Sequence, residues 1–157
     1  MVRGRRKRPQ VRSINVGYPP TVRQPYDPAV YPADEVYRDT VVSVLGAPVD
    51  GWIFELVYRY AIYHGRNIDW AIMIWARRVE DGMNPVRRRV QRIDICHSEV
   101  HCHNFRQTSD PDDDLGERDV IVSLSANDGV RVSHEWDDQM ALLSVQWPER
   151  IRRWIDG

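Results

Sequence analysis

Apolar and polar side chains alternate along much of this 157-residue chain, and a period of two residues is typical of β-strands. The clearest case is Trp52–Tyr63, which is rich in aromatic and β-branched residues and carries Glu55 and Arg59 on one side. Its other side is apolar and consists of Phe54, Leu56, Tyr58, Tyr60 and Ile62. Further extended segments are predicted at 70–79, 86–105 and 119–125. The irregular apolar parity within 86–105 predicts a bulge there.

A helical period replaces this alternation in the C-terminal part of the chain. The apolar stripe consists of Trp136, Met140, Leu143, Trp147, Ile151, Trp154 and Ile155. Ser133 is a candidate N-cap, and Pro148 is expected to kink or restart the helix. Two shorter segments are predicted before it. These are a helix over 32–45, where an early proline and a final glycine suit its two ends, and a brief strand over 130–132.

The order of these segments predicts an α+β domain. We expect a mainly antiparallel sheet of four to five strands with the C-terminal helix packed on one face, formed by residues 31–157. Residues 1–30 are basic and proline-rich, and they are expected to form an arm that is disordered when free. This arm could contact nucleic acid or another acidic partner, or it could simply solubilise the protein. The sequence leaves both interpretations open.

Composition restricts the cellular compartments in which the protein is expected. The formal net charge is −1, and the chain contains no long apolar run, so no membrane span is predicted. Prolines and polar residues follow the basic start, which argues against a secretory signal. Cys96 and Cys102 are expected to be reduced thiols because one extended strand would hold them too far apart for a disulfide. A cytoplasmic location is therefore predicted.

Three of the five histidines lie close together, between residues 97 and 103. On an extended strand, His97, Glu99, His101 and His103 would all point to the same face. One metal ion could not bind all four groups, because positions 97 and 101 would lie about 13 Å apart. The pair at 101 and 103, about 7 Å apart, could share an ion with ligands from elsewhere. We expect no metal cofactor, with a divalent transition metal as the alternative.

The same spacing suits acid/base cleavage of a phosphodiester, because one imidazole could accept a proton while another donates one. In this interpretation His101 and His103 are the acid and base, and Glu99 orients one of them. His97 is a further catalytic candidate. The substrate-binding candidates are Arg92, Arg106, Arg89 and Asp94. The structural alternative is that the histidines only form hydrogen bonds and that Glu99 pairs with a nearby arginine.

The motif Arg92-Ile-Asp94, followed by His97 and by His101-Cys-His103, resembles TumE-like toxins of bacterial toxin–antitoxin modules. The resemblance covers about residues 52–124; the N-terminal arm, an aspartate-rich loop predicted over 108–118 and the tryptophan-rich helix depart from it. It implies a compact antiparallel domain that acts on RNA and has an antitoxin protein as a partner. The whole chain also looks like uncharacterised actinobacterial proteins, which implies no activity.

The favoured hypothesis is therefore a cytoplasmic, RNA-directed, toxin-like protein that acts as a metal-independent endoribonuclease. The alternative is a non-catalytic module that binds nucleic acid or protein, whose histidine cluster is structural or metal-binding. Deleting residues 1–30 distinguishes the two. A module anchored by the arm should lose salt-dependent binding, whereas an enzyme should still cleave a small RNA.

Overall fold

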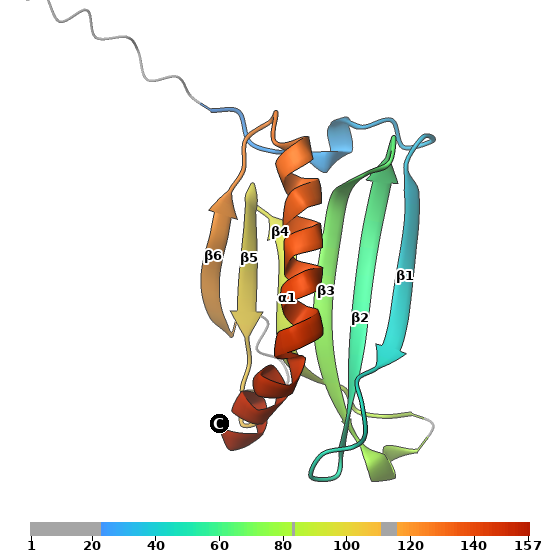
Figure 1. Cartoon of the computed structure of the whole chain (residues 1–157), viewed down its shortest axis with the longest axis vertical. Helices are drawn as coiled ribbons and strands as arrows, with labels where there is room; N and C mark the ends of the chain where they lie inside the picture. Colours follow the sequence, from blue (N-terminus) through green and yellow to red (C-terminus); the bar gives the residue numbers. More distant parts are fainter. Residues whose placement is uncertain (1–22, 83, 111–115) are drawn as a thin grey trace, which may run out of the picture.

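In the described part of the chain, a six-stranded antiparallel sheet packs against one C-terminal α-helix, as Figure 1 shows. The computed structural model describes residues 23–82, 84–110 and 116–157. The strands are β1 (Tyr37–Val44), β2 (Trp52–Tyr63), β3 (Arg66–Arg78), β4 (Arg88–Cys96), β5 (Glu99–Asn104) and β6 (Glu117–Ser123), the short 3-10 helices are η1 (Pro28–Val30) and η2 (Val79–Asp81), and the long helix is α1 (Gly129–Asp156). Each strand pairs with the next one along the chain. The predicted α+β class and the C-terminal helix are confirmed, whereas the predicted strand count was too low.

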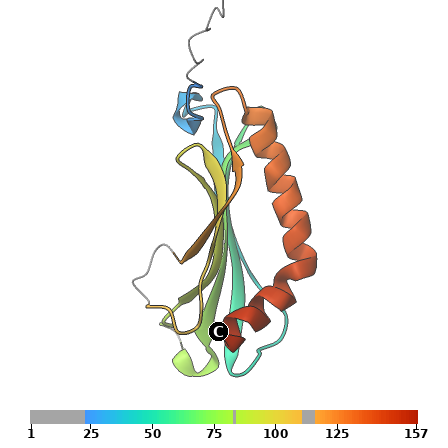
Figure 2. The same ribbon diagram turned by 90° about the vertical axis from the view of Figure 1, so that its left-hand side faces the viewer.

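Helix α1 covers one face of the sheet, as the edge-on view in Figure 2 shows. We call this the helix face; among its residues are Ile93 of β4 and Val100 of β5, which belong to the core shared with α1. Two tryptophans connect the layers, since the Trp70 indole donates to the Val132 carbonyl at 3.0 Å and the Trp154 indole donates to the Arg89 carbonyl at 2.9 Å. The opposite side is called the outer face, and among the described residues no α-helix lies on it.

The helix predicted over 32–45 is absent; strand β1 lies there instead. Strand β1 pairs along its whole length with β2, from Tyr37 opposite Ile62 to Val44 opposite Glu55. Its valines favour extended backbone, and cross-strand pairing outweighs the weak helix signals at its two ends. The strand prediction for β2 was correct in both bounds.

The segment 86–105 is a hairpin rather than one long strand. His97 and Ser98 adopt left-handed backbone, with φ of 52° and 60°, and the chain reverses between β4 and β5. The residues at 130–132 were also predicted wrongly, because α1 begins at Gly129 and includes them. The Asp128 carboxylate accepts hydrogen bonds from the backbone and hydroxyl of Ser125, which holds the chain immediately before the helix.

Pro148 lies inside α1, and the helix continues through it to Asp156. A proline has no backbone N–H, so the bond to the carbonyl four residues earlier is lost and the helix bends. Figures 1 and 2 show the last turns changing direction and leaning toward the lower end of the sheet. This bend brings Arg150 and Arg153 over β4 and β5, where they contact Gln91 and Asn104 respectively.

The predicted N-terminal arm lies largely outside the described residues, which begin at Arg23. Within the described part, Tyr26 is buried and its hydroxyl donates to the Ile68 carbonyl at 2.6 Å. The carbonyl of Gln24 accepts a hydrogen bond from Ala126. The domain boundary near residue 30 stays a prediction. Within the described ranges, no helix has both the length and the apolar character needed to cross a membrane.

Candidate functional site

Asp94, His101 and His103 meet on the outer face of the sheet, and we call them the histidine cluster. Alternation along each strand places them there, since their neighbours Ile93 and Val100 point into the core under α1. The pairing of β4 with β5 puts Asp94 directly opposite His101. The three side chains therefore gather from two adjacent strands that are joined by a single turn.

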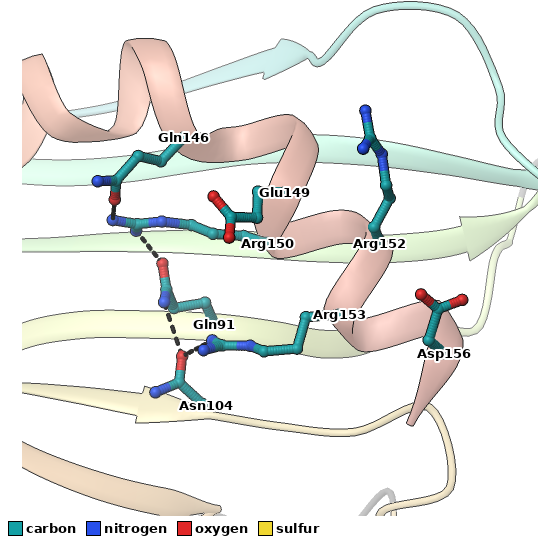
Figure 3. A pocket seen from close by; sticks show the side chains of 8 residues that line it. All are labelled: Gln91, Asn104, Gln146, Glu149, Arg150, Arg152, Arg153 and Asp156. Atoms are coloured by element: carbon teal, nitrogen blue, oxygen red, sulfur yellow. Dashed lines mark hydrogen bonds between the residues drawn. The ribbon is translucent and has the colours of Figure 1, made fainter.

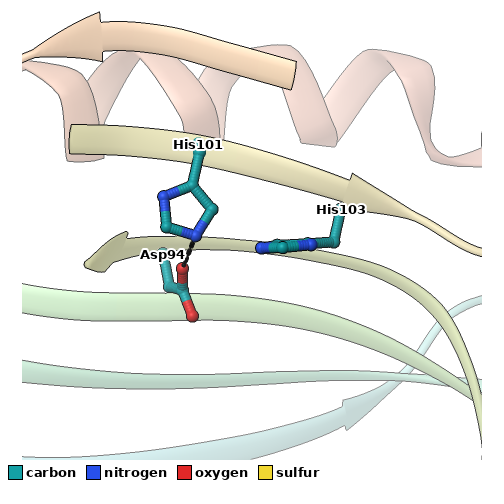
Figure 4. A group of neighbouring side chains, drawn as sticks. All are labelled: Asp94, His101 and His103. Carbon is teal, nitrogen blue, oxygen red and sulfur yellow. Dashed lines mark ion pairs between the residues drawn. The ribbon is translucent and has the colours of Figure 1, made fainter. Parts of the chain in front are cut away.

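The side chains of the histidine cluster converge on a small common space, as Figure 4 shows. His101 Nε2 lies 2.8 Å from Asp94 Oδ1, and Arg92 Nε lies 3.0 Å from the other carboxylate oxygen. Both separations are at ion-pair distance, but neither contact has the alignment of a hydrogen bond. The rings of His101 and His103 are edge-to-face, with centroids 4.7 Å apart. One potential ligand atom from each residue of the cluster lies within 4.8 Å of the others.

The histidine cluster is buried, although no α-helix of the described ranges covers it. His101 and His103 are each 2% exposed. Phe105 is also buried, and its ring lies 6.5 Å from the His103 ring. The Arg89 guanidinium lies over Phe105 and over Trp75 of β3, at 5.9 Å and 5.7 Å from the two ring centroids. Side chains from neighbouring strands therefore help to close this part of the outer face.

Burial of the imidazole lowers the pKa of His101 below its ordinary value of 6.5. The Asp94 carboxylate acts in the opposite direction but does not cancel the effect of burial. His103, Arg118 and Arg92 lower the pKa further because positive charge beside the imidazole disfavours its protonation. At neutral pH His101 is therefore an uncharged imidazole, which is the form that binds a metal ion.

Of the other predicted catalytic residues, His97 leaves the shared face, whereas Glu99 stays on the outer face of β5 but outside the histidine cluster. His97 lies in the exposed β4–β5 turn, where its Nδ1 is 2.9 Å from the Cys96 sulfur. Glu99 pairs with Arg118 and so is held by an arginine rather than orienting a histidine. The four-residue catalytic face predicted from one long strand is wrong in this respect, because the turn removes His97 from it.

The predicted substrate-binding residues are also divided. Arg92 and Asp94 pair with each other inside the site. Arg89 lies over aromatic rings, and Arg106 donates to the Gly157 carbonyl near the end of the chain at 2.9 Å. The acid/base prediction required imidazoles that water and a phosphodiester can reach. The burial of His101 and His103 contradicts that requirement.

Asp94 has a closer role in the site than the sequence suggested. It was predicted only as a substrate contact, yet it is the third member of the histidine cluster. A turn at residues 97 and 98 would have placed it beside His101, because paired positions across that turn sum to the same number. The turn contains neither glycine nor proline, so its sequence signal is weak.

No family model, curated protein or solved structure matches this chain. The resemblance to TumE-like toxins accordingly stays a prediction.

Proposed function

We propose that this protein is a metal-binding module in which the histidine cluster holds one divalent transition-metal ion, such as Zn²⁺, between β4 and β5. The observation that carries the proposal is the convergence of three potential ligand atoms from buried side chains within 4.8 Å of one another. Two imidazoles and one carboxylate form a ligand set that zinc and the neighbouring transition metals accept.

The side-chain chemistry supports a bound cation. Burial keeps the pKa of His101 low, so its imidazole need not release an extra proton before it binds a metal. Arg92 lies against one oxygen of Asp94, which leaves the other oxygen directed at the imidazoles. Partners of this kind commonly orient metal-binding carboxylates. Metal ligands at about 2.1 Å in a tetrahedral arrangement lie about 3.4 Å apart, so the cluster would contract slightly when it binds an ion.

A bound ion would cross-link two strands from the side that α1 does not cover. Three protein ligands would leave a further coordination position, but the burial of the cluster favours a structural role over reaction with a large substrate. A phosphodiester would have to displace the covering side chains to reach this site. Cleavage of RNA here stays a prediction from sequence. Binding of nucleic acid by the basic N-terminal residues also stays a prediction.

The proposal is tested by metal analysis of the full chain, prepared without a polyhistidine tag. We expect stoichiometric metal after dialysis against Zn²⁺ and, with Co²⁺, the visible absorption bands of a low-symmetry site. Asp94→Asn and His103→Asn should abolish both signals. The remaining histidines offer a matched control, since His64, His97 and His134 are all exposed.

Replacing those three exposed histidines with alanine should leave stoichiometric binding intact. Metal should also raise the melting temperature, because a ligand at 100 times its Kd stabilises the folded state by about 2.7 kcal/mol. Absence of bound metal in the wild type would overturn the proposal, and so would equal metal loss in the control variant. An RNA-cleavage assay on the same preparations tests the enzymatic alternative directly.

A further inference from the structure

A polar pocket of about 530 Å³ lies between the bent end of α1 and the helix-face side of β4 and β5. Five of its lining residues form one hydrogen-bonded group, shown in Figure 3, which we call the arginine pocket: Gln91, Asn104, Gln146, Arg150 and Arg153. It lies across the sheet from the histidine cluster, because positions 91 and 104 alternate with positions 94, 101 and 103 along the two strands. The pocket plays no part in the proposed metal site.

Hydrogen bonds hold both guanidinium groups against the sheet. Arg150 donates to the side-chain oxygen of Gln91 and, at 2.9 Å, to that of Gln146. Arg153 donates to the side-chain oxygen of Asn104 at 2.6 Å. The Gln91 amide donates to the same Asn104 oxygen at 2.7 Å, so the two arginines are joined through two amides.

These acceptors are all neutral. In the described parts of the chain, neither Arg150 nor Arg153 has a carboxylate oxygen at ion-pair distance. Glu149 and Asp156 also line the pocket, but neither pairs with an arginine in it. Two cations are thus held in one partly enclosed space, and neither has a carboxylate of the described residues at ion-pair distance.

The electrostatics of Arg150 reflect this arrangement. Burial lowers the pKa of its guanidinium, and the positive charge of Arg153 lowers it further, while Glu149 opposes the change. A partly desolvated cation such as Arg150, with a second positive charge beside it, gains most from an anion that bridges the two groups. Each guanidinium has five N–H donors and uses only one or two of them on amides, so donors remain for a ligand.

A simpler explanation covers part of these observations. Basic residues in the last turn of a helix interact favourably with the helix dipole, and Arg153 is such a residue. The dipole does not account for the direction of the side chains, because Arg150 and Arg153 reach sideways to strand residues. Arg152 shows the contrast: in Figure 3 its guanidinium is turned away from Gln91 and Asn104.

We propose that the arginine pocket binds an oxyanion of the phosphate class, held between the guanidiniums of Arg150 and Arg153. The planar guanidinium matches two oxygens of a phosphate group, which makes arginine the residue of choice for such ligands. The side-chain amide of Asn104 lies beside the same space and supplies a further donor. The ligand is a small phosphate compound or a phosphate group of a nucleic acid.

Calorimetric titration of the full chain with inorganic phosphate, at constant ionic strength, tests the site. We expect saturable binding that weakens about tenfold or more in Arg150→Gln and in Arg153→Gln, since each change removes a charged donor. Arg152→Gln is the matched control. Arg152 also lines the pocket, but its guanidinium points away from Gln91 and Asn104, so removal of the same charge from the same helix should leave phosphate binding within about twofold of wild type.

Two further ligands separate the sources of the phosphate group. A ribonucleoside 5′-monophosphate and a short single-stranded RNA are titrated into the same proteins. Tighter binding of either one, with competition by inorganic phosphate, identifies the natural class of ligand. Absence of saturable phosphate binding in the wild type overturns the proposal, and so does an equal loss in Arg152→Gln. If Arg150→Gln fails to fold, the more exposed Arg153→Gln decides the question.

Discussion

The two faces of the β4–β5 hairpin carry polar groups of opposite chemical character. On the outer face, the histidine cluster combines a carboxylate with two imidazoles and is closed by neighbouring side chains. On the helix face, the arginine pocket presents N–H donors that amide oxygens hold in place, and it opens to a cavity. One face therefore favours a cation and the other an anion. Strand alternation alone separates the two sites, since consecutive residues point to opposite faces.

The faces also differ in how they are stabilised. Helix α1 supplies apolar packing to the helix face through large side chains such as Trp154 and Leu143. The outer face lacks such a layer among the described residues and depends on paired charges and on Arg89, which lies over two aromatic rings. Apolar burial contributes more per residue than partly exposed charge pairs do. The helix face should thus dominate the stability of the protein.

The largest expected effect comes from Trp154→Ala. Trp154 is 1% exposed, and its ring contacts Trp52 and Phe54 at centroid distances of 5.1 Å and 5.7 Å. Its loss leaves a cavity under the end of α1 and should reduce the free energy of unfolding by about 3–5 kcal/mol, as measured by urea denaturation. Val145→Ala, on the exposed side of the same helix, should change it by less than about 0.5 kcal/mol. A small effect of Trp154→Ala would contradict the dominance of the helix face.

A smaller loss is expected when the carboxylate of the outer face is removed. In chelator-treated protein, Asp94→Asn leaves Arg92 and His101 without their partner and should cost about 1–3 kcal/mol of unfolding free energy. Glu99→Gln breaks the more exposed pair with Arg118 and should cost no more than about 1 kcal/mol. If the two variants prove equally stable, burial does not distinguish the histidine cluster from an ordinary surface pair.

Regular spacing of apolar residues correctly predicted the elements that bury one side in the core. Strand β2 was recognised in full because its apolar residues alternate without interruption, and α1 was recognised because its stripe runs on both sides of Pro148. Strand β1 was missed because it is mostly exposed, so it has no alternation to reveal it. Pairing with β2 determines the conformation of β1. This pairing is a tertiary interaction, and the local propensity of residues 37–44 does not predict it.

The regular alternation along one strand also predicted part of the geometry of the candidate site. The period of two correctly placed His101 and His103 on one face, because β5 is regular. The position of Asp94 depends on the register across a turn with no strong turn residue, and the burial of the cluster depends on side chains from other positions, among them Arg89 and Phe105. Neither relation can be derived from the spacing of residues along a single segment.

Removing the cover of the histidine cluster should have a modest effect on stability. Arg89→Gln eliminates the contacts with the rings of Trp75 and Phe105 and should cost about 0.5–1 kcal/mol. It should also speed the reaction of His103 with diethylpyrocarbonate, followed by mass spectrometry, because the ring becomes accessible. Arg59→Gln is the control: it removes an arginine from β2, which β3 and β4 separate from β5. Unchanged His103 reactivity in Arg89→Gln would show that other groups exclude water.

The smallest perturbation is a comparison of the two cysteines, because their reactivity can be measured in the wild-type protein. Both are free thiols, Cys96 at the end of β4 and Cys102 on the helix face of β5. Burial raises the pKa of the Cys102 thiol to about 11, so almost none of it is thiolate at pH 8. Iodoacetamide at pH 8 should therefore modify Cys96 at least about tenfold faster than Cys102, with the sites assigned by mass spectrometry. Cys96→Ser should remove the fast phase and change the unfolding free energy by less than about 0.5 kcal/mol. Similar rates for the two thiols would mean that α1 separates from β4 and β5 often enough to expose Cys102. The packing of the helix face would then be less stable than its buried contacts imply.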